Sequence, residues 1–262
     1  MNSAIYAGSF DPWTLGHSYV LTSAIKTFKH VTVIVAVNKE KKSHITPQDR
    51  ARLIAFEKNP FKDWWSTKPP FHLKDNLTII THSDLIANYA RDNNIQYLVR
   101  GLRSTTDFEA EFNLYFSNLA INEDLSTWAI LCPPEYLHYS STFARTVVGK
   151  SKIPFTGASF TAQALLLNWH KDIGQALDLL TLNGNLPRSQ ELLTREHHTR
   201  MKKVQYIFSQ LYGKEKNITQ NRISKISSLL KKELYTAKNP NLDSLQKTIK
   251  QVLKESFSLD IS

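Results

Sequence analysis

The stretch of residues 4–17, AIYAGSFDPWTLGH, constrains the fold of this chain more than any other. Its opening apolar run is too short for a helix and is typical of a buried strand. Gly8 ends this run, and Asp11–Pro12 predicts a turn, because a residue before proline avoids α geometry. Thr14 can then cap a helix whose apolar residues recur at helical spacing up to about residue 28. The sequence therefore predicts a strand, a tight turn and a helix at this end of the chain.

This predicted strand–turn–helix unit is also typical of a phosphate site. At a helix N-terminus the free backbone N–H groups and the helix dipole point toward one place and attract an anion. We expect Ser9, Thr14 and His17 at the mouth of that site. A histidine at a helix start can also be purely structural, with the hydrogen bonds of its ring satisfied locally. The spacing of the whole stretch favours the functional interpretation.

Strands and helices are predicted to alternate along the next hundred or so residues. The β-branched run at 31–37 is typical of a buried parallel strand. Residues 59–76 contain two tryptophans and three prolines, and we expect an irregular loop with exposed aromatic side chains. The order of elements predicts an α/β fold, a Rossmann-like dinucleotide-binding fold with a parallel sheet and ligands beyond the carboxyl ends of its strands. Further strands are predicted at 77–80, 97–99 and 127–132, and helices at 46–56, 83–90 and 107–122.

Composition excludes several other classes of protein. The 262 residues are 41% hydrophobic, an ordinary share for a globular protein. No apolar run approaches the roughly 18 residues that a membrane span needs. Cys132 is the only cysteine, so an internal disulfide is impossible, and the N-terminus lacks the pattern of a signal peptide. We therefore expect a cytoplasmic protein without a membrane partner.

The net charge of +10 is unevenly distributed along the chain. Residues 1–170 carry 17 lysines and arginines against 14 acidic residues, whereas residues 171–262 carry 16 against 9. We expect a catalytic domain at 1–170 and a basic α-helical extension at 171–262. A structural addition to the first domain explains the extension best, and binding of nucleic acid or an acidic partner is the alternative. Nucleic acid is not expected as a partner, because the basic residues lack interleaved aromatics or a known motif.

Two arginines flank Gly101 directly after a predicted strand. Arg100 and Arg103 there suit bidentate contacts with phosphate oxygens. The alternative is that they form surface ion pairs with Asp107 or Glu109.

Other polar residues also lie where a predicted strand ends or a predicted helix begins. Lys41 follows the strand at 31–37, where a lysine can reach a phosphate as a point charge, although loop lysines are usually solvated. Glu111 could accept a hydrogen bond from a ribose hydroxyl. Residues 140–142 precede an amphipathic segment, so they can cap a helix, bind phosphates at its N-terminus, or do both. Without a GxSxG, HExxH or Walker A pattern, we expect no covalent intermediate and no metal cage built by the protein.

Residues 4 to about 149 resemble the bacterial pantetheine-phosphate adenylyltransferases. The stretch GSFDPWTLGH resembles the GxFDPxxxGH signature of the nucleotidyltransferase superfamily, which contains its T/HxGH motif. The block VRGLR at 99–103, followed by DFEAE at 107–111, resembles the VRGLR and DFEYE block of this family more specifically. Residues 83–85 and 134–136 also lie at the spacing that the family shows.

The resemblance implies a set of functional residues. The residues expected to be catalytic are His17, Ser9, Lys41 and Arg100. Those expected to bind ATP are Ser9, Phe10, His17, Gly101, Leu102, Arg103, Glu111, Tyr136, Leu137, His138, Tyr139, Ser140, Ser141 and Thr142. Those expected to bind the acceptor are Ser9, Lys41, Ile86, Arg100, Leu114 and Asn118.

The resemblance also implies an activity: the transfer of AMP from ATP to 4′-phosphopantetheine, giving dephospho-coenzyme A and pyrophosphate. Mg²⁺ is the expected cofactor, bound through the ATP phosphates, and a homo-oligomer is expected because the family forms hexamers. One alternative is another nucleotidyltransferase, such as a nicotinate-nucleotide adenylyltransferase, against which the RGLR block argues. The other is a non-catalytic interaction protein built on the same scaffold.

Overall fold

The computed structural model describes residues 3–37, 43–59, 64–73, 76–148 and 157–166. The chain divides into two compact units, and the first contains residues 1–146 and 156–158. The second contains Val147 and helix α6 (Phe160–Leu166) among the described residues. The predicted boundary at residue 170 and the predicted α-helical extension lie outside the described residues. None of the described helices is long and apolar enough to cross a membrane.

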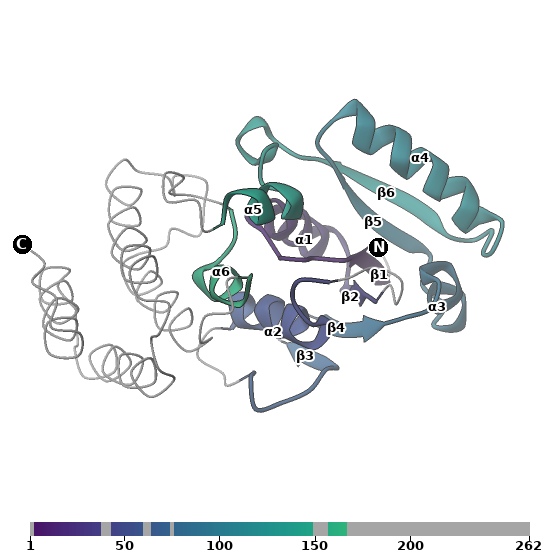
Figure 1. Ribbon diagram of the computed structural model, residues 1–262. Helices are drawn as coiled ribbons and strands as arrows, with labels where there is room; N and C mark the ends of the chain where they lie inside the picture. Colours follow the sequence, from purple (N-terminus) through teal and green to yellow (C-terminus); the bar gives the residue numbers. More distant parts are fainter. Residues whose placement is uncertain (1–2, 38–42, 60–63, 74–75, 149–156, 167–262) are drawn as a thin grey trace, which may run out of the picture. The chain divides into compact units, whose positions relative to one another are not determined.

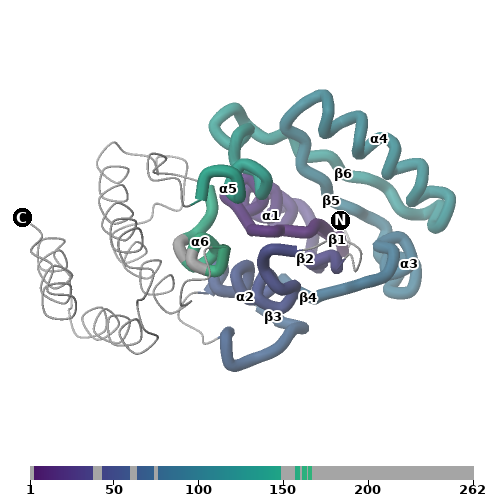
Figure 2. The backbone as a smooth tube through the Cα atoms, viewed as in Figure 1, coloured from purple at the N-terminus to yellow at the C-terminus, as the bar shows by residue number. Residues whose placement is uncertain are grey.

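The first unit is built on a six-stranded sheet, ordered β3-β4-β2-β1-β5-β6 (Figure 1). Neighbouring strands are parallel except for β3, which runs antiparallel to β4 at one edge. The N-terminal strand β1 therefore lies between β2 and β5, which come from later parts of the chain (Figure 2). The strands are β1 (Ser3–Gly8), β2 (His30–Ala36), β3 (Phe71–Leu73), β4 (Leu77–His82), β5 (Tyr97–Leu102) and β6 (Ser126–Leu131).

Helices connect the parallel strands, as crossover connections in an α/β fold require. Helix α1 packs against β5, and α2 packs against β4. The helices of this unit are α1 (Leu15–Thr27), α2 (Pro47–Lys58), α3 (Ile86–Asp92), α4 (Thr105–Leu119), the short 3₁₀ helix η1 (Pro134–Tyr136) and α5 (Ser141–Val147), whose last residue is assigned to the second unit.

The hydrophobic core lies on the central strands. Ile5 of β1 and Ile34 of β2 are fully buried, and Leu98 of β5 is nearly so. They form one cluster with Ala87 and Ala90 of α3. Both faces of these strands are covered, which explains their nearly continuous apolar sequence. The sheet topology confirms the predicted Rossmann-like α/β fold.

Most predicted elements are confirmed to within one or two residues at each end. Helix α2 is capped by Thr46, whose hydroxyl accepts a hydrogen bond from the Asp49 N–H at 3.1 Å. Helix α1 likewise begins after Thr14, as the turn in the first stretch predicts.

The prediction of an irregular loop with exposed aromatics at 59–76 is wrong. Phe71–Leu73 forms strand β3, and Trp64 is buried with 2% of its surface exposed. The Trp64 ring packs against Phe71 at 5.2 Å, and its indole N–H donates to the Asn59 carbonyl oxygen at 2.8 Å. Residue order alone did not indicate that β3 pairs with the later strand β4.

Three other predicted elements have boundaries that differ from the structure, and one of them is helix α4, which ends at Leu119 instead of at about residue 122. Arg100 and Gly101 lie within β5, because they pair with Ala129 and Ile130 of β6, and so they do not lie in the loop expected after residue 99. Helix α3 begins only at Ile86, and the preceding Leu85 is 55% exposed instead of contributing to an apolar face.

Candidate active site

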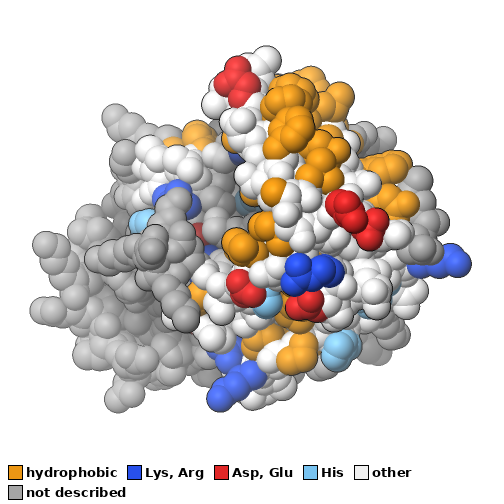
Figure 3. Space-filling model, turned by 90° about the vertical axis from the view of Figure 1, so that its right-hand side faces the viewer, with side chains coloured by type: hydrophobic (Ala, Val, Ile, Leu, Met, Phe, Trp, Pro, Cys, Tyr) orange, Lys and Arg blue, Asp and Glu red, His pale blue; other side chains and the backbone are white. Residues whose placement is uncertain are grey.

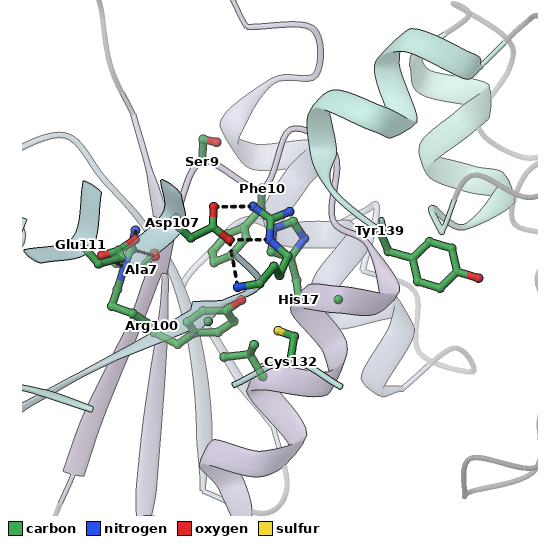
Figure 4. A pocket seen from close by; sticks show the side chains of 15 residues that line it. Ala7, Ser9, Phe10, His17, Arg100, Asp107, Glu111, Cys132 and Tyr139 are labelled. Carbon is green, nitrogen blue, oxygen red and sulfur yellow. Dashed lines mark hydrogen bonds and ion pairs between the residues drawn. The ribbon is translucent and has the colours of Figure 1, made fainter. Parts of the chain in front are cut away.

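A cavity of about 200 Å³ opens at the carboxyl end of the central strands, where the fold class places ligands. Figure 4 shows the residues that line it, among them His17, Arg100, Asp107 and Glu111. They come from β1, α1, β5 and α4, together with Cys132 after β6 and Tyr139 before α5. The complete lining is Tyr6, Ala7, Gly8, Ser9, Phe10, Gly16, His17, Val20, Arg100, Gly101, Arg103, Asp107, Glu111, Cys132 and Tyr139.

The turn between β1 and α1 is fixed by buried aromatic rings. Phe10 is 2% exposed and adopts a φ of 48°. Its ring lies edge-on to Trp13 at 4.9 Å and to His17 at 5.2 Å, measured between ring centres. Trp13 lies 5.4 Å from His17 on the same measure. The imidazole therefore sits in an aromatic setting that restricts its movement.

Local hydrogen bonds define the orientation of the His17 ring. The Thr14 N–H donates to Nδ1 of His17 at 3.0 Å. Nδ1 is thus an acceptor, and the proton of the neutral ring lies on Nε2. Burial, assisted by the positive charges of Arg103 and Arg100, lowers the pKa of His17 to about 3. At neutral pH the site contains a neutral imidazole that can donate from Nε2.

Gly16 allows the start of α1 to approach the chain before α5. A Cβ at Gly16 would lie 2.7 Å from the Tyr139 carbonyl oxygen, closer than real Cβ contacts. The Thr14 hydroxyl is a hydrogen-bond donor to that same carbonyl at 3.0 Å. The glycine of the GH pair is therefore required by packing as well as by the motif.

Three side chains from distant elements hold carbonyl groups of the β1–α1 turn. Arg50 of α2 donates to the Ser9 carbonyl oxygen, and Arg145 of α5 donates to that of Asp11. The Ser141 hydroxyl donates to the carbonyl of Pro12 at 2.7 Å. Sequence analysis did not identify Arg50 or Arg145, because nothing in their local sequence indicates the turn that they contact.

Arg100 is paired within the described structure. Its guanidinium forms a bidentate ion pair with the Glu111 carboxylate, with Nε donating to Oε2 at 2.6 Å and Nη2 to Oε1. Nη1 donates to the Ala7 carbonyl oxygen at 2.6 Å. The two residues expected to contact different substrates thus contact each other, across the cavity edge formed by β5 and α4.

Arg103 is held in a similar way by Asp107. The Asp107 carboxylate accepts from Nε of Arg103 at 2.9 Å, from Nη2 at 3.1 Å and from the Arg103 backbone N–H at 3.0 Å. This is the ion pair that sequence analysis weighed as the alternative for Arg103. Both groups line the cavity, so the paired guanidinium borders the space that a ligand would occupy.

The structure brings together only part of the predicted site. Ser9, Phe10, His17, Arg100, Gly101, Arg103, Glu111 and Tyr139 line the cavity. Lys41 lies outside the described residues. The other predicted ATP-binding residues do not line this cavity, and their assignments stay predictions: Leu102, Tyr136, Leu137, His138, Ser140, Ser141 and Thr142.

The three remaining residues predicted to bind the acceptor do not line the cavity. Ile86, the first residue of α3, packs against the core cluster. Leu114 is 39% exposed on α4, whereas Asn118 of the same helix is buried. Their roles also stay predictions.

Sequence analysis missed several residues of the lining. Tyr6 lies inside an apolar strand, so its sequence context indicated only a core position. Asp107 was considered only as an ion-pair partner, and Cys132 only for its redox setting. Because side chains alternate along a strand, the sequence indicates that Tyr6 and Ile5 point to opposite faces of the sheet. It does not indicate that a cavity lies next to Tyr6.

Comparison with known proteins shows the family to which the chain belongs. A family profile described as cytidylyltransferase-like matches residues 5–147. The chain therefore belongs to the cytidylyltransferase-like family of nucleotidyltransferases, and it is an enzyme of that class.

Similar proteins include the phosphopantetheine adenylyltransferases of two strains of Leptospira biflexa serovar Patoc. Each is 31% identical over 144 residues, which cover 55% of this chain and 82% of the relative. The chain also matches the structure of a putative nicotinate-nucleotide adenylyltransferase from Vibrio parahaemolyticus, with 22% identity, a TM-score of 0.40, and coverage of 64% of this chain and 92% of that one. Plasmodium falciparum nicotinic acid mononucleotide adenylyltransferase in complex with NaAD matches with 16% identity, a TM-score of 0.38, and coverage of 57% and 84%.

Proposed function

We propose that this enzyme transfers AMP from ATP to 4′-phosphopantetheine and releases pyrophosphate, forming dephospho-coenzyme A. The observation that carries the proposal is the set of His17, Arg100 and Arg103 on one cavity at the carboxyl end of the sheet. Support for the acceptor comes from the 31% identity to phosphopantetheine adenylyltransferases and from the VRGLR and DFEAE blocks.

The proposed reaction is an in-line displacement. A phosphate oxygen of the acceptor attacks the α-phosphorus of ATP, the bond from that phosphorus to the oxygen leading to the β-phosphorus breaks, and pyrophosphate leaves. The acceptor phosphate is already anionic, so the enzyme needs no general base, and catalysis consists of positioning and charge stabilisation.

Each residue type suits one part of this task. The neutral His17 ring would donate from Nε2 to charge that develops on the α-phosphate, with the Ser9 hydroxyl beside it. Arg100, and Lys41 outside the described residues, would hold the acceptor phosphate. Arg103 and the N-terminus of α5 would hold the β- and γ-phosphates.

We also propose that magnesium reaches the site with ATP and keeps water and phosphate ligands. The two carboxylates of the cavity, Asp107 and Glu111, are each paired with an arginine and so are poorly placed to hold the ion. In the described part of the chain, no group of three or more His, Cys, Asp or Glu side chains is arranged to hold a metal.

The proposal includes a cytoplasmic homo-oligomer. Helix α4 exposes a row of aromatic rings, in which Phe112 lies 5.9 Å from Phe108 and 5.0 Å from Phe116. Each of the three is more than half exposed. Figure 3 shows hydrophobic side chains gathered on this face of the molecule. An exposed apolar row of this size favours contact with a second copy of the chain.

The test is pyrophosphate release from ATP, measured in parallel with 4′-phosphopantetheine and with nicotinate mononucleotide. We expect release with 4′-phosphopantetheine only, and dephospho-coenzyme A as the second product. Release with nicotinate mononucleotide alone would replace the proposed acceptor. If neither acceptor supports release from ATP, the adenylyl-transfer proposal fails. If CTP in place of ATP gives no release either, the interaction-protein alternative gains support.

A further inference from the structure

Tyr6 of β1 lines the cavity and carries a hydroxyl to which the proposed reaction assigns no role. The residue is 4% exposed. Its ring packs edge-on against Phe10 at 5.2 Å and Trp13 at 6.0 Å. Among the described residues, the structure gives this hydroxyl no hydrogen-bond partner. Since Tyr6 lines the cavity, a ligand bound there can supply the partner that a tyrosine hydroxyl normally has.

Charged and polar groups of the cavity surround Tyr6. Tyr6 lines the cavity together with Arg100, Arg103, Cys132 and Glu111, and these same four groups act electrostatically on the phenol. Burial raises the pKa of Tyr6 well above its usual value. The phenol therefore stays protonated and is an O–H donor of a residue whose cavity is also lined by two arginines.

The polarity of the site indicates what this donor would meet. The Arg100 and Arg103 side chains attract an anion, and an O–H group is well suited to donate to an anionic oxygen. Glu111 and Asp107, the nearby carboxylates, already accept from the two arginines. A phosphate oxygen is thus the acceptor with the best electrostatic match.

We propose that the Tyr6 hydroxyl donates a hydrogen bond to a phosphate oxygen of the nucleotide bound in this cavity, and that Tyr6 is a phosphate-binding residue of the enzyme. The proposal rests on the proposed function for the identity of the nucleotide. It does not depend on which acceptor the enzyme uses.

The variant Tyr6→Phe tests this proposal, because it removes only the hydroxyl and keeps the ring in its aromatic setting. Tyr97→Phe is the matched control: Tyr97 is half-buried at the amino end of β5, packs against Phe28 and does not line the cavity. Binding of ATP and of inorganic pyrophosphate would be measured by calorimetry for wild type and both variants, and melting temperatures would confirm that each is folded.

For Tyr6→Phe we expect the dissociation constants of ATP and pyrophosphate to rise roughly tenfold or more, as for the loss of a hydrogen bond to a charged group. Tyr97→Phe should bind both like wild type. Unchanged binding of both compounds to a folded Tyr6→Phe variant would overturn the proposal, whether or not the enzyme is active. If wild type binds pyrophosphate but does not use 4′-phosphopantetheine, the proposed function fails while the binding comparison still tests Tyr6.

Discussion

His17 shows at the scale of one residue how a buried setting determines chemistry. The ring is fixed by the Thr14 N–H on one nitrogen and by aromatic neighbours on its faces. The positive charges of two arginines that line the same cavity disfavour protonation of the ring. The result is a neutral donor whose position is defined before substrate arrives, and such preorganised donors stabilise transition states effectively.

The first prediction is that His17→Ala removes most turnover but leaves the dissociation constant of ATP within about tenfold. A donor that acts on developing charge typically contributes about 10² to 10³ in rate. Turnover and ATP binding would be measured separately, with His72→Ala of the exposed edge strand β3 as the control. Equal losses in binding and turnover would mean that His17 stabilises bound ATP in the ground state and not the transition state.

The second prediction concerns pH. Because burial lowers the pKa of His17 to about 3, the ring should stay neutral from pH 8 down to about pH 5. The unfolded chain binds a proton at this residue below about pH 6.5, so the folded protein loses stability as the pH falls from there toward 3. The histidine resonances followed by NMR, with the His17 signal assigned through His17→Gln, check this. A His17 midpoint between pH 5 and 8 would contradict it.

The third prediction separates the two arginines. Arg100→Ala should raise the KM for 4′-phosphopantetheine more than that for ATP, and Arg103→Ala should do the reverse. Charge-assisted hydrogen bonds are each worth about 1.5–3 kcal/mol, or ten- to over a hundredfold. Steady-state kinetics with each substrate varied in turn measure this, with the exposed Arg91→Ala as the control. Indistinguishable effects on the two substrates would reject the division of roles.

At the scale of elements, α4 has two faces with different tasks. One face supplies Asp107 and Glu111, a turn apart, to Arg103, just after β5, and to Arg100 of β5. The other exposes the row formed by Phe108, Phe112 and Phe116. Its neighbour β6 is an edge strand, and an open edge is a further surface where another chain can pair.

The fourth prediction is that Phe112→Glu produces a smaller assembly than wild type. A carboxylate at the centre of the aromatic row would have to lose its water on association, which is costly for an unpaired charge. Light scattering after size-exclusion chromatography measures the mass. Asn113→Glu adds the same charge at the neighbouring exposed position and should leave the assembly intact. A wild-type monomer, or an unchanged mass for Phe112→Glu, would refute the prediction.

At the scale of the whole molecule, every residue that lines the cavity belongs to the first compact unit. Much of the positive charge of the chain lies elsewhere, since residues 171–262 carry 16 basic against 9 acidic side chains. The machinery for nucleotide binding and the source of the strongly basic character therefore occupy different parts of the sequence.

The fifth prediction is that a chain ending near residue 170 keeps the cavity but loses solubility or changes its assembly. The reason is that the removed residues contain many apolar side chains at helical spacing, which favours a structural addition over a free tail. Size-exclusion chromatography and the pyrophosphate assay on that shortened chain check this. A soluble chain with unchanged assembly and activity would favour a partner-binding role for residues 171–262.

The sequence by itself determined the class of fold and the core of the site. Apolar runs, turn residues and cap residues are local signals, and they located β1, α1, β2 and α2 almost to the residue. The spacing from Gly8 to His17 and the block at 99–111 were sufficient to predict that these segments meet at the carboxyl end of the sheet, since parallel strands end at a common edge, and residues of both segments line the cavity there.

Only the tertiary structure decided which side chains pair. That Arg100 contacts Glu111, that Arg50 and Arg145 hold the turn, and that Trp64 is buried against β3 all depend on contacts between residues far apart in sequence. The same holds for Tyr6, which has the sequence context of a core residue but a hydroxyl at the cavity. Such contacts carry no local pattern, because burial and partner choice are set by the packing of whole elements against one another.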